Sequence, residues 1–221
     1  MFREAVLLIL VGLILSACTS TATDTPVAEQ PTDASPPTTE GPVATSGVND
    51  FFAQNGLTLA PPSCDGVLTP EQTEGPYYKP DSPERNSLLE SDPPGRRLIL
   101  IGYVLDQDCQ PIPDAWLDFW QADGRGVYDN SGYTLRGHQF TDKQGRYYLA
   151  TVVPGQYPGR TEHIHVKVRA PRAASALTTQ LYFPTAAANA QDRLFNPANL
   201  LRVEERDDYL VGFFDFIIAA E

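Results

Sequence analysis

Short apolar segments separated by turn-forming residues recur through the second half of the chain. Segments rich in Val, Ile, Leu and aromatic residues predict strands at 97–105, 115–121, 146–153, 163–168, 178–183 and 209–218. Clusters of Asp, Gly and Pro between them predict turns, and residues 186–208 are expected to hold a short helix or an irregular loop near the C-terminus. Because the predicted strands are short and do not alternate regularly with helices, the pattern predicts an all-β fold, a β-sandwich of mostly antiparallel strands.

The clearest alternation falls on the segment that carries two of the three histidines. Positions 164, 166 and 168 are Ile, Val and Val, whereas the odd positions hold His163, His165 and Lys167. Residues two apart share one face of a strand, with Cα atoms about 6.5–7 Å apart, so the two imidazoles can converge on one metal ion. The spacing alone fits two surface histidines on a strand face equally well.

The charge balance narrows the classes of partner. The chain has 221 residues, with 16 Lys and Arg against 28 Asp and Glu, which gives a net charge of −12. Such an acidic chain is poorly suited to bind nucleic acid or an anionic membrane surface. Its 20 prolines and 16 glycines fit a fold with many turns. The length allows one large domain or two small ones.

Residues 1–17 have the pattern of a secretion signal. An uncharged apolar run of 11 residues occupies positions 5–15, which is the length of a signal-peptide core and too short to span a membrane. The sequence Leu-Ser-Ala-Cys that ends at Cys18 resembles the lipobox of bacterial lipoproteins. This resemblance implies cleavage before Cys18, a lipid on its sulfur, and an exported protein that is anchored to the bacterial cell envelope. The alternative is an ordinary signal peptide in which Cys18 has no special role.

The next segment differs in composition from the rest of the chain. Residues 19–50 are rich in Thr, Ser, Pro and Ala and contain no Lys, Arg or aromatic residue. Such a segment buries too little apolar surface to offset the entropy of ordering it. We therefore expect a disordered tether over residues 18–50 and a folded domain over residues 51–221.

Two cysteines lie within the predicted domain. Cys64 precedes the first predicted strand, and Cys109 lies in the turn that follows that strand. Because an exported protein meets an oxidising compartment, a disulfide between them is favoured. The alternatives are two separate buried thiols, a metal site or a redox role, although the spacing does not suggest a metal site.

The segment before the two histidines adds a different chemistry. Tyr157 and Arg160 lie in a loop rich in Pro and Gly just upstream of His163. A free phenol has a pKa near about 10 and is a poor ligand at neutral pH, but a trivalent cation lowers the pKa of a group that it coordinates. Phenolate is a hard oxygen donor and suits Fe(III) better than Zn(II) or Cu(I). The alternative for Tyr157 is an ordinary hydrophobic contact of the loop.

Five ordered blocks of the sequence together resemble the intradiol ring-cleavage dioxygenases, the family of the protocatechuate and catechol dioxygenases. The blocks are residues 73–78 (TEGPYY), 120–128 (WQADGRGVY), 136–142 (RGHQFTD), 154–165 (PGQYPGRTEHIH) and 179–183 (TQLYF). The resemblance implies an enzyme that inserts both atoms of O₂ into a catechol-type aromatic diol. Such an enzyme cleaves the ring between the two hydroxylated carbons and forms a muconate-type product.

The same resemblance implies roles for individual residues. The implied ligands of a non-haem Fe(III) are Tyr128, Tyr157, His163 and His165. Arg160 is implied as the cation beside the reacting ring, and Gln180 as a polar group that faces the substrate or supports the ligands. Tyr133 is the alternative for the first tyrosine ligand, and His138 is expected to be a hairpin residue without a metal role.

The resemblance further implies where the substrate enters. The residues expected at the mouth of its pocket are Gly75, Pro76 and Tyr77. Tyr182 is expected either to line this pocket or to belong to the core. Asp118 and Asp142 are expected to be turn or surface groups.

Two other functions compete with this interpretation. A sandwich of this kind can serve as a binding module for carbohydrate or adhesion at a cell surface, but such a module does not need Tyr, Tyr and His-x-His together with Arg160. A zinc hydrolase needs a third histidine or a carboxylate beside the pair. Glu162 is the local candidate, and on a strand it faces away from both histidines.

Overall fold

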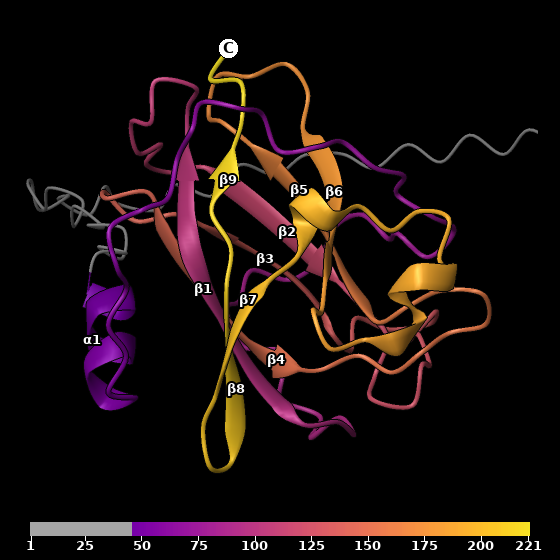
Figure 1. Cartoon of the computed structure of the whole chain (residues 1–221). Helices are drawn as coiled ribbons and strands as arrows, with labels where there is room; N and C mark the ends of the chain where they lie inside the picture. The colour runs from indigo at the N-terminus through magenta and orange to yellow at the C-terminus, as the bar shows by residue number, and fades with distance from the viewer. Residues whose placement is uncertain (1–45) are drawn as a thin grey trace, which may run out of the picture. The chain divides into compact units, whose positions relative to one another are not determined.

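The computed structural model describes residues 46–221, and within them two β-sheets pack face to face (Figure 1). The five-stranded sheet has the order β4-β1-β8-β7, with β9 beside β1. Its strands are β1 (Arg97–Leu105), β4 (Arg146–Val152), β7 (Arg202–Glu205), β8 (Tyr209–Phe213) and β9 (Phe216–Ile217). The four-stranded sheet has the order β3-β2-β5-β6. Its strands are β2 (Trp116–Trp120), β3 (Arg136–Phe140), β5 (His163–Arg169) and β6 (Leu177–Tyr182). Most strand pairs are antiparallel, so the predicted β-sandwich is confirmed.

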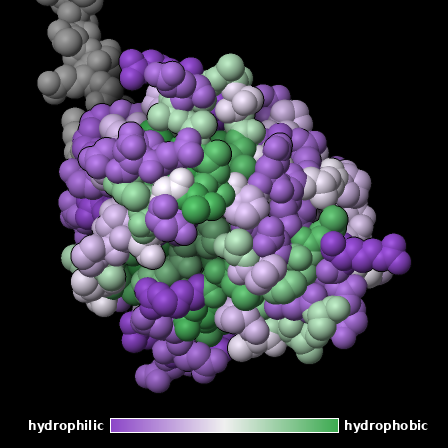
Figure 2. All heavy atoms as spheres, turned by 45° about the horizontal axis from the view of Figure 1, so that its top comes forward, coloured by the Kyte–Doolittle hydropathy of each residue, from purple (hydrophilic) through white to green (hydrophobic). Residues whose placement is uncertain are grey.

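The main core lies between the two sheets. Leu100 of β1, Phe119 of β2 and Ile164 of β5 are fully buried in it, and burial of each such side chain contributes about 1.5–3 kcal/mol. The apolar positions of β5 all point into this core, as the alternation predicts, so His163 and His165 lie on the opposite face of the sheet. The molecular face turned forward in Figure 2 is apolar in a central hollow and mostly hydrophilic around it.

A smaller apolar cluster covers the outer face of the five-stranded sheet. Helix α1 (Ser46–Gln54) places Val48 and Phe52 in this cluster, and the Phe51 ring stacks on Tyr148 of β4 at 3.8 Å. The folded part therefore begins before residue 51, the expected boundary. The predicted signal peptide, Cys18 and most of the predicted tether lie outside the described residues. No helix within residues 46–221 has the length and apolarity needed to cross a bilayer.

The segment predicted as one strand over 209–218 is two strands, β8 and β9. Both pair in parallel with β1, and the chain leaves the sheet between them at residues 214–215. There the Phe214 carbonyl approaches Gly102 so closely that a Cβ on Gly102 would lie 1.8 Å from its oxygen. Asp215 stabilises this break, because its carboxylate accepts the backbone N–H groups of Tyr103 at 3.0 Å and Ser63 at 2.9 Å.

The stretch over residues 186–208 is more ordered than the sequence suggests. It contains two short 3₁₀ helices, η1 (Ala187–Gln191) and η2 (Pro197–Asn199), as expected for a short helical region. It also contains β7, which the sequence pattern does not predict. This strand pairs only with β8, and none of its residues is fully buried, so it shows no alternation of apolar and polar positions.

A disulfide joins the entry segment to the turn after β1. The Cys64 and Cys109 sulfurs are bonded, with Cα atoms 5.8 Å apart and a sequence separation of 45. The bond crosses from the N-terminal segment to the first turn of the sandwich, the connection favoured by the sequence analysis.

Replacing both cysteines, Cys64→Ser with Cys109→Ser, is expected to lower the free energy of unfolding by about 4 kcal/mol. The loop of 45 residues is then no longer closed in the unfolded chain, and a loop of that length accounts for roughly this difference. Urea unfolding without reductant measures it. Added dithiothreitol should lower the midpoint of the native protein and leave that of the double variant unchanged. Equal midpoints for the two proteins without reductant would contradict the expectation.

Candidate metal centre

The register of the four-stranded sheet places predicted site residues in one row. Arg136 of β3 pairs with Trp120 of β2, Trp120 with His165 of β5, and His165 with Gln180 of β6. Paired residues on adjacent strands project to the same face, so these side chains lie side by side on the face away from the core. His163 lies at the start of β5 on this same face.

The two histidines approach each other through their Nε2 atoms. These nitrogens are 3.1 Å apart, and the side chains are only 4% and 2% exposed. Burial lowers the pKa of His163 to about 4 and holds the pKa of His165 well below its ordinary value, where the neighbouring His163 adds to the effect. Both rings are therefore neutral at pH 7. The indole of Trp120 stacks on His165 at 4.8 Å and fixes its plane.

In each possible arrangement of protons on this pair, at least one nitrogen lone pair has no hydrogen-bond donor. His163 Nδ1 donates to the Thr161 carbonyl at 2.6 Å, so its Nε2 carries a lone pair. If His165 Nε2 donates to that lone pair, then His165 Nδ1 is an acceptor with no partner, and no donor among the described residues reaches it. If the proton sits on His165 Nδ1, two lone pairs face each other at 3.1 Å. A cation held by both Nε2 atoms removes this repulsion, so the arrangement fits a metal ion.

Two of the predicted phenols join the histidines. The Tyr128 hydroxyl lies 3.5 Å from His163 Nε2. The Tyr157 ring packs edge-on to that of Tyr128 at 6.1 Å. Burial raises the pKa of Tyr128, so the protein alone keeps this side chain a neutral phenol and a cation is needed to ionise it. The structure thus gathers the four predicted ligands in one place.

Other candidate ligands are absent from this place. The Tyr133 hydroxyl donates to the Pro80 carbonyl at 3.0 Å, and its ring lies under Lys79, so it is not part of the cluster. Glu162 accepts from the Thr161 hydroxyl instead of approaching the histidines. Within residues 46–221, no three His, Cys, Asp or Glu side chains gather as a metal site. A ligand set larger than the histidine pair therefore needs the tyrosines.

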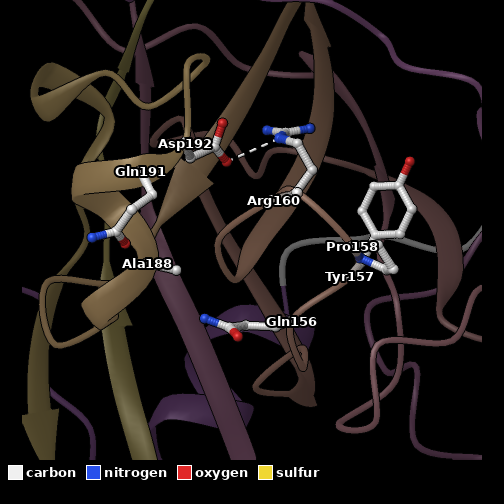
Figure 3. Close-up of a pocket in the computed structure, with 8 residues that line it drawn as sticks. Gln156, Tyr157, Pro158, Arg160, Ala188, Gln191 and Asp192 are labelled. Carbon is white, nitrogen blue, oxygen red and sulfur yellow. Dashed lines mark hydrogen bonds and ion pairs between the residues drawn. The ribbon is translucent and has the colours of Figure 1, made fainter.

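Arg160 is held rigidly at the side of this cluster. Its Nε donates to Asp192 at 2.9 Å (Figure 3), and its Nη2 donates to Gln180 Oε1. Asp192 also accepts the backbone N–H groups of Leu194 and Thr161 at 2.9 Å each. Burial opposes ionisation of Asp192, but these backbone donors and Arg160 outweigh it and hold its pKa below the ordinary value. Asp192 was not found from the sequence, because it lies beyond η1 in a stretch without a motif.

The residues expected at the pocket mouth divide into two groups. Gly75 lies over His165, since a Cβ on it would be 3.4 Å from the imidazole Cε1. The Tyr77 ring stacks on the Tyr128 ring, with their centroids 4.5 Å apart. Pro76, which lies between Gly75 and Tyr77 in the sequence, is exposed. Tyr182, in contrast, is fully buried, and its hydroxyl donates to the Leu194 carbonyl at 2.8 Å. It therefore belongs to the interior behind Gln180, not to the pocket.

Asp118 does not lie at the surface, so this expectation is wrong. Its side chain is buried and accepts from the Ser82 hydroxyl at 2.7 Å and the Tyr78 hydroxyl at 3.1 Å. Burial raises the pKa of Asp118. Beside it, Lys167 forms an ion pair with Glu74 at 2.6 Å. These contacts fasten residues 73–82 across the outer face of the sheet, which holds Gly75 and Tyr77 over the histidines. Asp142, also buried, has the expected turn role, because it accepts from Arg146 four residues later.

The buried histidines predict that the metal-free protein loses stability in mild acid. The pKa of His163 is about 4 in the folded chain and about 6.5 in the unfolded chain, so the unfolded state binds protons first as the pH falls. Stability is then highest above pH ~6.5 and falls by about 2 kcal/mol at pH ~5 from His163 alone. Urea unfolding of metal-free protein at the two pH values measures this. A His163→Gln variant should lose less stability between the two pH values. Equal stability of the native protein at both pH values would contradict the burial of neutral imidazole rings.

Known proteins resemble the chain over this region. Residues 73–208 match a family model described as Dioxygenase. In a solved structure, the dioxygenase domain of a dioxygenase carbohydrate-binding protein fusion from Streptomyces sp. SirexAA-E is 51% identical, with a TM-score of 0.68. That match covers 70% of this chain and 100% of the domain.

Two curated relatives are more distant. The protocatechuate 3,4-dioxygenase beta chain of Burkholderia cepacia is 30% identical over 50% of this chain and 54% of its own length. The catechol 1,2-dioxygenase of Acinetobacter baylyi is 30% identical over 51% of this chain and 45% of its own length. The chain thus spans about half the length of these two relatives. The matched residues include all of the four-stranded sheet and its histidine pair, and the chain belongs to the intradiol ring-cleavage dioxygenase family.

Proposed function

We propose that this protein is a non-haem Fe(III)-dependent dioxygenase that inserts both atoms of O₂ between the two hydroxylated carbons of a catechol-type diol. The observation that carries the proposal is the donor set, in which two neutral imidazole nitrogens 3.1 Å apart lie beside buried Tyr128. Tyr157 completes this set, and no carboxylate joins it among the described residues. Imidazole with phenolate oxygen suits ferric iron better than zinc or copper(I).

The protein's part in the reaction is to hold the metal ion and to orient its ligands and the diol. Ferric iron, when bound by His163, His165, Tyr128 and Tyr157, supplies positive charge that ionises the diol and draws electron density from its ring. The Thr161 carbonyl fixes the tautomer of His163, and Trp120 fixes the plane of His165. Tyr157 is half-buried, and its phenolic oxygen is the group that would accept one proton from the diol.

Arg160 provides charge stabilisation in the same site. Asp192 and Gln180 hold its guanidinium in one orientation, so it needs no rearrangement when negative charge builds on the substrate ring. A preorganised donor of this kind contributes about 3–4 kcal/mol to a transition state. Gly75 and Tyr77 lie over His165 and Tyr128, and the low local dielectric of a covered site strengthens this interaction.

We further propose that the protein is exported and lipid-anchored at Cys18 in the cell envelope. The N-terminal pattern of residues 1–18 supports this location. The bond between Cys64 and Cys109 agrees with it, because disulfides persist mainly in oxidising compartments. The proposed partners are a catechol-type diol, O₂ and, through the lipid, the membrane.

The activity is tested by oxygen uptake with product identification. Protein reconstituted with iron should consume one O₂ for each catechol and form a muconate-type diacid. Under ¹⁸O₂, mass spectrometry should find two ¹⁸O atoms among the four carboxyl oxygens of this product. A product cleaved beside the hydroxyl pair would contradict intradiol chemistry. Diol binding without oxygen uptake by protein that contains stoichiometric iron would favour the binding module instead.

A further inference from the structure

A hollow of about 410 Å³ adjoins the candidate metal centre. It lies between the loop at residues 156–160 and the 3₁₀ helix η1, and Figure 3 shows the side chains that surround it. Tyr157 and Arg160 belong both to its wall and to the metal centre. The hollow and the metal centre therefore share these two side chains.

The wall of the hollow mixes apolar and polar side chains and has no net charge. The charged side chains in its wall, Arg160 and Asp192, are paired with each other at 2.9 Å and cancel. Arg160 donates a second hydrogen bond to Gln180. The remaining polar side chains of the wall are the amides of Gln156 and Gln191, which are exposed and can each donate and accept hydrogen bonds.

The middle of this wall is open. Gly159 has a φ of +80°, and a Cβ placed on it would meet no atom within 4 Å. Ala188 on η1 contributes only a methyl group from the other side. The space is thus large enough for a substituent of several atoms, and 410 Å³ lies within the range of small-molecule sites of about 300–1,000 Å³.

We propose that this hollow is a subsite for a neutral, hydroxyl-bearing substituent on the diol ring, which rests on the proposed dioxygenase function. The Gln156 and Gln191 amides match a hydroxyl as donors and acceptors. A carboxylate substituent gives up hydration there and meets the Asp192 carboxylate, a like charge, in the wall. The subsite therefore selects substrates by charge as well as by length.

The test compares diols of nearly equal shape that differ in charge. The probes are catechol, 4-(2-hydroxyethyl)catechol and 3,4-dihydroxyphenylacetate, and calorimetry under anaerobic conditions, which prevent turnover, gives Kd for each with iron-reconstituted full-length protein. We expect the alcohol to bind about 10-fold more tightly than the carboxylate. Equal affinity, or tighter binding of the carboxylate, overturns the proposal.

Two alanines of η1 provide a matched pair of variants. Ala188→Trp fills the hollow, whereas Ala190→Trp adds the same side chain at an exposed position of η1 outside its wall. The ratio of the alcohol's Kd to that of catechol should rise about 10-fold in the first variant and stay unchanged in the second. An unchanged ratio in Ala188→Trp also overturns the proposal. Because these readouts are binding constants, selective binding without oxygen uptake leaves the subsite standing and contradicts the dioxygenase function.

Discussion

Replacing His165 with alanine is expected to abolish ring cleavage and most iron binding. Its Nε2 lies 3.1 Å from that of His163, and both rings are neutral and buried, so each nitrogen is available to a metal ion without losing a proton. Loss of groups that merely support a ligand lowers metal affinity about 10–100-fold, and loss of a ligand is expected to exceed that. Iron content after dialysis and oxygen uptake with catechol measure the two effects.

The third histidine provides the control for this experiment. His138 of β3 lies near Ser82, with its Nδ1 2.6 Å from the Ser82 carbonyl oxygen, and it has no contact with the histidine pair. His138→Ala should therefore keep stoichiometric iron and most of the activity, although it removes a contact of the covering segment. If His165→Ala kept its iron while His138→Ala lost it, the metal centre would have to be placed elsewhere.

Substitution of Arg160 by lysine is expected to lower kcat about 100–1,000-fold while the iron content stays constant. The guanidinium reaches Asp192 and Gln180 at the same time through different nitrogens, and a lysine ammonium is a single point that cannot reproduce this fork. The charge is conserved, but it is no longer fixed beside the substrate ring. Steady-state kinetics with catechol, together with iron analysis, separate the loss of orientation from a loss of metal.

Arg172→Lys is the matched control for this substitution, since Arg172 lies exposed in the turn after β5. It should leave kcat, KM and iron content unchanged. If Arg160→Lys changed only KM, the guanidinium would act in substrate binding alone, and its proposed role in stabilising charge would be wrong.

The predictable part of the fold is the part set by local patterns. The strand β1 begins and ends at the predicted residues, because nine successive residues favour a buried strand and turn residues follow them. The alternation in β5 places His163 and His165 on the outer face. Tyr157, just upstream of His163, was a candidate from its position and chemistry, whereas Tyr128, 35 residues before His163, followed from the family resemblance because no periodicity relates positions so far apart.

The features missed from the sequence depend on contacts between distant segments. The break between β8 and β9 exists because Gly102 admits the Phe214 carbonyl, and nothing near residue 214 signals it. Asp118 looks like a polar strand residue until Ser82 and Tyr78 are seen to cover it. Such partners follow from the way the chain crosses the sheet, which single-sequence periodicity does not contain.

The most direct test of the proposed centre is the visible absorption spectrum of the iron-loaded protein. Phenolate bound to ferric iron gives a charge-transfer band, so we expect a coloured protein whose band shifts when catechol is added. Tyr128→Phe should weaken this band, and Tyr133→Phe should leave it intact because that hydroxyl faces Pro80. A colourless protein with one ferric ion per chain would contradict ligation by tyrosine.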